Sequence, residues 1–237
     1  MKRFVLLLLC FPIFAQAEDW PQWLGPTRDG SSSAKIKPWK GDLEQAWKIS
    51  VGEGNSSPVV VGDTLILHTK GDNTAHGTPT EKVIAIDVKN GKEKWSKTYE
   101  KPKFEPFFGK GPRATPVVHE KKVYTLGNTG VLSCFELEGG KEVFRVETLD
   151  DPVKDNLVFG VSASPLISGS HVIVQGGSKS GKGIKAFDKN SGKLVWTSEK
   201  GDASSYAAPV LLGKEIVVLT GANLVSLDPD GKTLWKT

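Results

Sequence analysis

The chain has 237 residues, of which 24% are charged, and a formal net charge of +4 with its four histidines neutral. Its 31 basic and 27 acidic residues nearly balance and are mixed along the chain, so the composition gives no support to a nucleic-acid-binding surface. The chain contains two cysteines, too few for a disulfide-stabilised scaffold.

The first 17 residues have the pattern of a secretory signal peptide. Lys2 and Arg3 precede an unbroken apolar run, and Ala15-Gln16-Ala17 is a small-x-small cleavage sequence. The apolar run is too short to span a bilayer. We therefore expect cleavage after Ala17 and an exported chain, periplasmic or associated with the outer envelope, with no membrane span and with Cys134 as its single cysteine.

Four segments after the signal peptide repeat one pattern. Each has a small residue, a proline, two or three apolar residues, a polar turn and a second apolar strand. A third apolar run, a glycine-bearing turn and a strand with an aromatic residue follow each segment, without helical periodicity, so each unit is predicted to be a meander of four short strands. The segments are SSPVVVGDTLIL (56–67), ATPVVHEKKVYT (114–125), ASPLISGSHVIV (163–174) and AAPVLLGKEIVV (207–218).

Four-stranded units that repeat roughly every 40–50 residues predict an all-β fold, a β-propeller of four-stranded antiparallel blades. A β-sandwich also has short strands, but it has no reason to repeat one motif at the same place in every unit. About four blades are expected in this chain. They lie near residues 56–100, 113–150, 162–200 and 206–237.

One predicted strand has no partners nearby in the sequence. LEQAWKIS (43–50) resembles the fourth strand of a blade, with Trp47 in the aromatic position, yet no first three strands precede it. We expect it to close a last blade that is missing here. Residues 18–42 would then be a lead segment, and residues 43–237 an incomplete ring that needs missing C-terminal blades to reach seven or eight.

A shorter pattern recurs at the third turn of every unit, as in AIDVKNGKEKW (85–95) and AFDKNSGKLVW (186–196). We expect the acidic side chain to accept hydrogen bonds from turn amides, the glycine to make the turn, and the aromatic ring to pack between blades. A catalytic residue is needed once, whereas these recur in every unit, so we predict a structural role. The residues are Asp87, Gly91, Trp95, Glu136, Phe144, Asp188, Gly192, Trp196, Asp228, Gly231 and Trp235.

This pattern resembles the tryptophan-docking motif of the pyrroloquinoline-quinone (PQQ) repeat family of β-propellers, and the resemblance covers residues 43–237. The family includes quinoprotein dehydrogenases and non-enzymatic relatives of the BamB type, which belong to the outer-membrane protein assembly machinery. DWPQWLGPTRDG (19–30) also resembles the opening of secreted PQQ-like propellers, which more often carry Arg where Leu24 stands.

For a dehydrogenase, the resemblance implies PQQ over the propeller axis, a Ca²⁺ held by carboxylate and amide oxygens, a carboxylate base and often a disulfide of adjacent cysteines. This sequence has no adjacent cysteines and no Cys-x-x-Cys-His haem attachment site. Its histidines do not pair at metal-ligand spacing. We expect no catalytic, cofactor or metal site in this chain. PQQ and Ca²⁺ belong to the alternative, a quinoprotein dehydrogenase whose catalytic residues lie in the missing C-terminal blades.

Two insertions between units, KFEPFFGKGPRA (103–114) and VKDNLVFGVSA (153–163), are the better functional candidates because variable loops on a rigid scaffold carry binding specificity. They favour an exported, non-catalytic scaffold that binds one or more envelope proteins. The alternative is that the phenylalanines only cap the interfaces between blades. The predicted binding face consists of Phe107, Phe108, Lys110, Arg113, Asn156 and Phe159.

Overall fold

The computed structural model describes residues 18–104, 106–177, 181–199 and 201–237. The predicted signal peptide lies outside this part, so its cleavage stays a prediction. Every regular element in the described part is a β-strand. It therefore contains no helix long and apolar enough to cross a membrane.

The strands form four separate antiparallel sheets of four strands each, in which every strand pairs with its neighbour in the sequence. The predicted all-β fold of four-stranded antiparallel blades is confirmed. Blade 1 contains β1 (Val59–Val61), β2 (Thr64–Lys70), β3 (Thr80–Asp87) and β4 (Glu93–Glu100), and blade 2 contains β5 (Val117–His119), β6 (Lys122–Leu126), β7 (Val131–Glu136) and β8 (Glu142–Glu147). Blade 3 contains β9 (Leu166–Ser168), β10 (His171–Gln175), β11 (Ile184–Asp188) and β12 (Leu194–Thr197), and blade 4 contains β13 (Val210–Leu212), β14 (Glu215–Leu219), β15 (Leu224–Leu227) and β16 (Thr233–Lys236).

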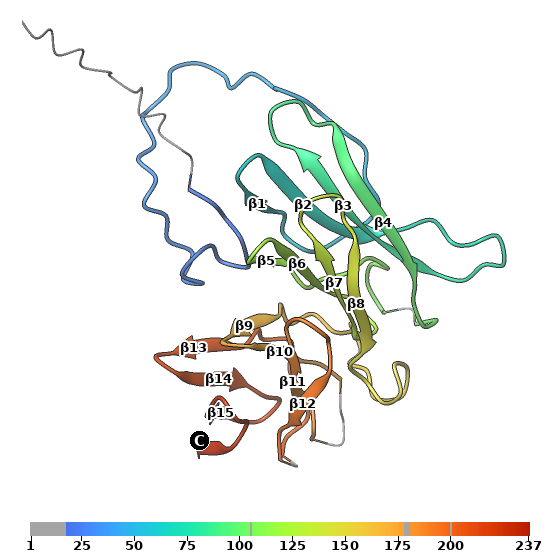
Figure 1. Ribbon diagram of the computed structural model, residues 1–237, viewed down its shortest axis with the longest axis vertical. Coiled ribbons are helices and arrows are strands. Elements are labelled where there is room, and N and C mark those ends of the chain that lie inside the picture. Colours follow the sequence, from blue (N-terminus) through green and yellow to red (C-terminus); the bar gives the residue numbers. More distant parts are fainter. Residues whose placement is uncertain (1–17, 105, 178–180, 200) are drawn as a thin grey trace, which may run out of the picture.

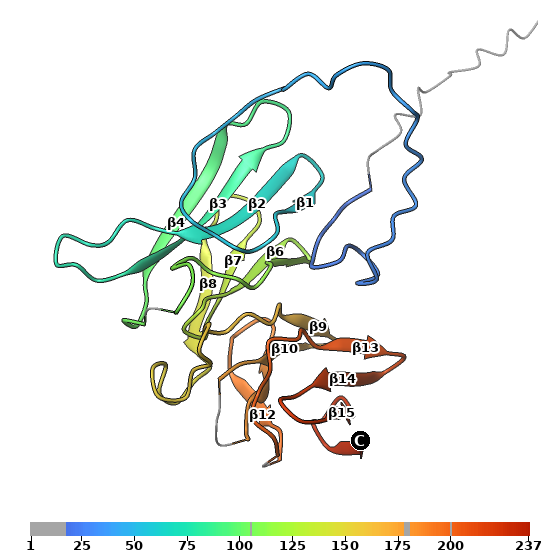
Figure 2. The ribbon, with the colours of Figure 1, turned by 180° about the vertical axis from the view of Figure 1, so that it is seen from behind.

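The blades follow one another around an arc, with β1, β5, β9 and β13 on its inner side (Figures 1 and 2). The middle strands are covered on both faces by neighbouring blades, so β7 is buried at every position from Val131 to Phe135. The outer strand β4 buries only Trp95 and Tyr99, because it lies at the rim. Three apolar clusters fill the spaces between successive blades, and each large side chain buried there stabilises the fold by roughly 1.5–3 kcal/mol.

In blades 1, 2 and 3 the aromatic residue packs on the glycine turn of the next blade. Trp95 donates its Nε1 hydrogen to the Leu137 carbonyl at 2.8 Å. Its ring lies against Gly140, where a Cβ atom would come within 2.5 Å of the ring. The same packing places Trp47 on Gly91, Phe144 on Gly192 and Trp196 on Gly231.

Three of the four acidic residues of the repeated motif hold their turns as expected, and Glu136 is the exception. Asp87 Oδ1 accepts hydrogen bonds from the backbone amides of Lys89 at 2.8 Å and Asn90 at 3.2 Å. Asp188 and Asp228 accept equivalent bonds from their own turns. In blade 2 the turn is closed by a hydrogen bond from the Glu136 backbone amide to the Lys141 carbonyl. In blade 4 Trp235 Nε1 donates to Glu215, and Trp235 is 36% exposed.

Residues 43–50 form no strand, contrary to the sequence prediction, because the described part offers no neighbouring strand with which they could pair. Trp47 nevertheless takes the aromatic position, since its Nε1 donates to the Val88 carbonyl at 2.7 Å and its ring covers Gly91. The closure of a last blade by this segment stays a prediction.

The first part of the lead segment, residues 19–30, runs along the inner side of the arc. Trp20 forms an antiparallel bridge with Val60 of β1, with N–H to O distances of 2.8 and 2.9 Å. The Pro21 carbonyl accepts a hydrogen bond from the Val118 amide of β5 at 2.8 Å. The segment therefore joins blade 1 to blade 2 through backbone groups that their innermost strands would otherwise leave unpaired.

Arg28 extends the same connection to the other two blades. Its guanidinium donates to the carbonyls of Pro165 and Pro209, both at 3.0 Å, and lies 5.7 Å from the ring of Trp23. Burial lowers the pKa of Arg28 to about 10. Leu24 lies in the left-handed region at φ 60° and is 37% exposed; nothing in the structure explains the leucine at this position.

Candidate functional site

Four aromatic rings form a continuous row across the three connections between blades. The ring centroids of Phe107 and Phe108 are 4.7 Å apart, those of Phe108 and Phe159 are 6.1 Å apart, and those of Phe159 and Tyr206 are 5.7 Å apart. These are favourable aromatic packing distances. We call Phe107, Phe108, Phe159 and Tyr206 the aromatic row.

Three residues of the aromatic row are exposed to solvent, and Phe159 is half-buried. Phe107 is 75% exposed, Phe108 is 64% exposed and Tyr206 is 41% exposed. Rings that only capped a blade interface would be buried in it, as Tyr99 is between blades 1 and 2. An exposed, contiguous apolar surface of this kind is typical of an interaction site.

Lys110 and Arg113 shape the first connection. The Arg113 guanidinium donates to the carbonyls of Phe108 and Gly109, which fixes the backbone under the two phenylalanines. The backbone amide of Lys110 donates to Glu53 Oε1 at 2.8 Å. Arg113 therefore braces the connection, and Lys110 is an exposed residue within it.

Asn156 does not lie on the exposed face where the sequence analysis placed it. The residue is 4% exposed, and its Nδ2 donates to the carbonyls of Asn128 at 2.9 Å and Pro152 at 3.1 Å. The amide is drawn inward because these buried carbonyls need donors. Asn156 holds the second connection from beneath.

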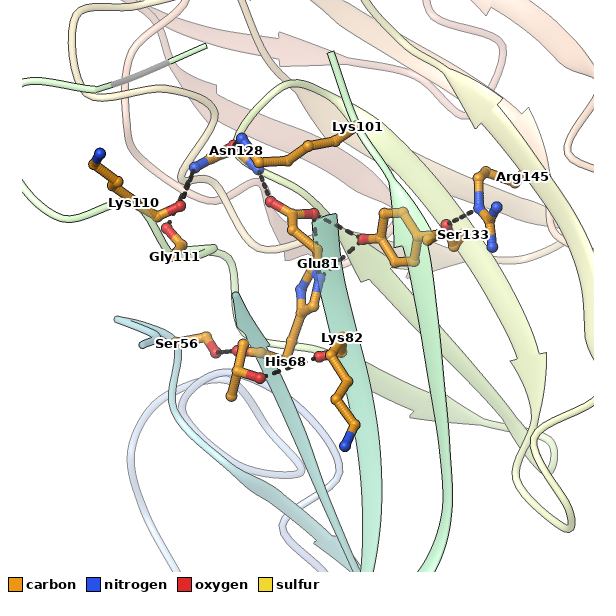
Figure 3. Close-up of polar contacts among 12 residues, drawn as sticks. Ser56, His68, Glu81, Lys82, Lys101, Lys110, Gly111, Asn128, Ser133 and Arg145 are labelled. Atoms are coloured by element: carbon orange, nitrogen blue, oxygen red, sulfur yellow. Dashed lines mark hydrogen bonds and ion pairs between the residues drawn. The ribbon is translucent and has the colours of Figure 1, made fainter. Parts of the chain in front are cut away.

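Asn128, in the turn between β6 and β7, joins the two connections. Figure 3 shows its contacts with Lys110 and Gly111 of the first connection. Its Nδ2 donates to the carbonyls of Lys110 at 3.1 Å and Gly111 at 3.4 Å in the first connection. Its own carbonyl accepts the amides of Asn156 and Val161, both at 2.9 Å, from the second connection. One buried residue thus fixes the backbone that carries three of the four rings.

A buried charged cluster holds Asn128 in turn. Glu81 is 0% exposed; its Oε1 accepts the Asn128 amide at 3.1 Å and its Oε2 accepts the Tyr99 hydroxyl at 2.8 Å. His68 Nε2 lies 3.4 Å from the same Oε2, and Lys101 Nζ donates to Asn128 Oδ1 at 3.0 Å. Figure 3 shows these side chains converging between blades 1 and 2.

The Glu81 carboxyl is ionised in this surrounding. Burial alone raises its pKa, but the hydrogen bonds and charges of His68, Tyr99 and Lys101 outweigh burial and hold the pKa below its ordinary value. A buried carboxylate is tolerated only when it is paired and hydrogen-bonded. The cluster therefore positions the face rather than offering a group to solvent.

The described residues contain no group of three or more His, Cys, Asp or Glu that could hold a metal ion. Cys134 is 0% exposed, and burial raises the pKa of its thiol to about 12, which makes it a poor nucleophile.

Sequence reasoning missed Tyr206 and Asn128. Tyr206 stands in the shortest of the three connections, so attention to the longer insertions passed over it; the signal was an aromatic residue in each connection. Asn128 gave no signal, because its partners lie 17 to 47 residues away in the sequence.

Sequence comparison decides the family. A family described as outer membrane protein assembly factor BamB matches residues 36–147 and 101–237. The chain belongs to this family. The resemblance of the BamB-type chain to PQQ-repeat propellers, inferred from its docking motif, is thereby confirmed.

A curated relative of this BamB-type chain is the quinoprotein glucose dehydrogenase of Escherichia coli K12. It is 26% identical, with 81% of this chain and 28% of the relative covered. The chain spans less than a third of the length of this relative.

Solved structures of both kinds share the fold. BamB from Moraxella catarrhalis is 17% identical with a TM-score of 0.56, covering 81% of this chain and 51% of that one. The quinohemoprotein alcohol dehydrogenase from Comamonas testosteroni is 19% identical with a TM-score of 0.68, covering 94% of this chain and 41% of that one. These similarities establish the β-propeller fold alone.

Proposed function

We propose that this chain belongs to an exported, non-catalytic scaffold of the cell envelope that presents the aromatic row to a partner protein. The aromatic row, with three exposed rings and the half-buried Phe159, carries the proposal. The signal-peptide pattern and the membership of a BamB-type family support the envelope location.

The row has the properties of an interface centre. Aromatic side chains dominate binding energy at protein interfaces, and each fully covered ring contributes roughly 1.5–3 kcal/mol. The backbone beneath Phe107, Phe108 and Phe159 is already fixed through Asn128 and Arg113. A preformed surface loses little conformational entropy on binding, which favours affinity.

In-cell photo-crosslinking tests the proposal with the complete protein. A photoreactive phenylalanine analogue at position 107 should crosslink one defined envelope protein, and Phe108→Ser with Phe159→Ser should reduce that crosslink at least about tenfold. The same analogue at the exposed Val195 of β12 is the matched control. A crosslink pattern at position 107 identical to that at position 195 would exclude the aromatic row as the partner surface.

A quinoprotein dehydrogenase is the second candidate, favoured by the sequence relation to a quinoprotein glucose dehydrogenase. The described residues do not fit the implied groups, because they assemble no carboxylate cluster for Ca²⁺ and their single cysteine is buried. Under this proposal the catalytic residues would lie outside the chain. Reduction of an artificial electron acceptor by the complete protein with PQQ and Ca²⁺ would establish it, and no quinone binding would eliminate it.

A further inference from the structure

The backbone carbonyls beside Phe108 are already occupied. Every carbonyl from residue 108 to residue 112 accepts a hydrogen bond from within the chain. The donors are the Arg113 guanidinium, the side-chain amide of Asn128 and the backbone amide of Asn55. Figure 3 shows the contribution of Asn128. This stretch of the first connection therefore offers little to a partner that donates hydrogen bonds.

Donor groups of the same surface are unused. The backbone amides of Phe107, Phe108 and Gly109, all of them exposed residues, donate to no acceptor within the described part of the chain. The Tyr206 hydroxyl oxygen accepts the Phe159 amide at 3.4 Å, and no acceptor for the hydroxyl hydrogen lies among the described residues. Water solvates an exposed donor, so a partner that covers these groups must replace the water with acceptors.

Aromatic rings and unused donors together define the chemistry of the partner. The partner must offer apolar surface and acceptors and bring few donors, because a donor covered without an acceptor weakens a complex. Proline meets this requirement, since it keeps its carbonyl, lacks an N–H group and carries an apolar ring. Proline-rich segments form the polyproline II helix, in which the carbonyls make no internal hydrogen bonds. Surfaces lined by aromatic rings bind them in this form.

The spacing of the rings suits such a helix. A polyproline II helix advances about 9 Å in each turn of three residues. Neighbouring ring centroids of the aromatic row are 4.7, 6.1 and 5.7 Å apart, so one turn extends over about two of these steps. The helix is preformed and the backbone beneath the row is fixed, so neither loses much conformational entropy on binding.

Charge does not select an acidic partner instead. The two connections carry charged groups of both signs near one another. Glu53 Oε1 lies 2.8 Å from the backbone nitrogen of Lys110, and Asp151 Oδ2 lies 3.6 Å from Lys154 Nζ. A carboxylate of a partner would meet negative as well as positive groups at this surface, whereas the uncharged carbonyls of a proline-rich segment avoid like-charge repulsion.

We propose that the partner of the aromatic row presents a proline-rich segment in the polyproline II conformation. Proline rings pack on Phe107, Phe108 and Phe159, and a carbonyl of the segment accepts the Tyr206 hydroxyl. This inference rests on the proposed function, because it names the chemistry of the segment that covers the same surface.

Fluorescence anisotropy with the complete protein and fluorescein-labelled decaproline tests the inference. Decaproline should bind saturably with a Kd below about 1 mM. Phe108→Ser should weaken binding at least about tenfold, and Tyr206→Phe, which keeps the ring and removes the hydroxyl, about fivefold. Leu194→Ser, at an exposed residue of β12, is the matched control and should leave the affinity unchanged. No saturable binding, or an affinity of either ring variant equal to that of the parent, would overturn the proposal.

Two further labelled probes separate proline from other acceptors. A (Gly-Ser)5 peptide keeps the carbonyls but has N–H groups and no rings, so it should bind at least about tenfold more weakly than decaproline. Decaglutamate, the probe for an acidic segment, should also bind more weakly. If either probe bound as tightly as decaproline, the surface would not be selective for proline and the proposal would fail.

Competition distinguishes this inference from the proposed function. In envelope extracts, saturating decaproline should reduce the crosslink formed at position 107 at least about tenfold. A crosslink that persisted undiminished would refute the proline-rich segment and leave the aromatic row as a partner surface. Absence of a crosslink specific to position 107 would instead refute the proposed function, and this inference with it.

Discussion

The glycine beneath each docked aromatic ring has two independent reasons to be glycine. Gly140 has a φ of 65°, in the left-handed region that disfavours a side chain, and its face lies against the ring of Trp95. Gly139 also has a positive φ, 72°, but nothing lies within 4 Å of the position of its Cβ. Comparing substitutions at Gly139 and Gly140 therefore separates the cost of backbone strain from the cost of displacing the packed ring.

Gly140→Ala should destabilise the protein more than Gly139→Ala. Backbone strain in each variant costs about 1–2 kcal/mol, and displacement of the Trp95 ring should add about 1–3 kcal/mol in Gly140→Ala. Urea unfolding followed by tryptophan fluorescence measures both. An equal loss of unfolding free energy in the two variants would mean that the Trp95 ring can move away from the turn without cost.

Glu81 makes the free energy of unfolding depend on pH in the acidic range. Its folded pKa lies below its ordinary value of 4.5, so as the pH falls below 4.5 the unfolded carboxyl takes up a proton before the folded one does. The free energy of unfolding therefore falls with pH in this window.

Glu81→Gln should cost about 1–3 kcal/mol at pH 7 and flatten the decline in stability between pH 5 and pH 3. Urea unfolding at a series of pH values tests this, with the exposed Glu93→Gln as control. If stability declined between pH 5 and pH 3 as steeply in Glu81→Gln as in the parent, other carboxyl groups would be responsible for the decline.

At the scale of elements, Asn128 couples two connections that are distant in the sequence. Asn128→Ala removes the donors to Lys110 and Gly111 and should speed amide hydrogen exchange in residues 106–114 about tenfold. Crosslinking at Phe107 should fall although no ring has changed. The exposed Asn73→Ala is the control, and protected amides in Asn128→Ala would refute the coupling.

The strands, their order and the docking motif were predictable because they depend on local signals. Alternating apolar residues define each strand, and the acidic, glycine and aromatic residues of each turn contact groups of the same turn or of the next repeat. Asn128 and the cluster around Glu81 were not predictable, since a buried polar network is specified by three-dimensional proximity. Asn156 shows the same limit: its polar side chain was consistent with an exposed position, but in the structure its amide donates a hydrogen bond to the buried Asn128 carbonyl.

At the scale of the molecule, the lead segment is what connects all four blades along their inner strands. Trp20 and Pro21 use backbone groups to reach β1 and β5, whereas Arg28 uses its side chain to reach the residues before β9 and β13. Successive blades also meet through apolar clusters and through hydrogen bonds such as that from Trp95 to Leu137. The hydrogen bonds of the lead segment add a link along the inner strands that reaches all four blades.

Arg28→Ala should loosen blades 3 and 4 selectively. Loss of the hydrogen bonds to Pro165 and Pro209 should cost about 1–3 kcal/mol, because a charged donor with two acceptors is removed. Hydrogen exchange should quicken in β9 and β13 and stay unchanged in β1 and β5, which keep the contacts of Trp20 and Pro21.

Two further variants sharpen the interpretation of Arg28. Arg28→Lys should restore only part of the protection, since one ammonium group cannot match the two-pronged geometry of a guanidinium that reaches Pro165 and Pro209 together. Lys35→Ala, in the exposed second part of the lead segment, should change nothing. If Arg28→Ala quickened exchange equally in all four inner strands, the lead segment would stabilise the propeller as one unit, and Arg28 would not be a specific link between blades 3 and 4.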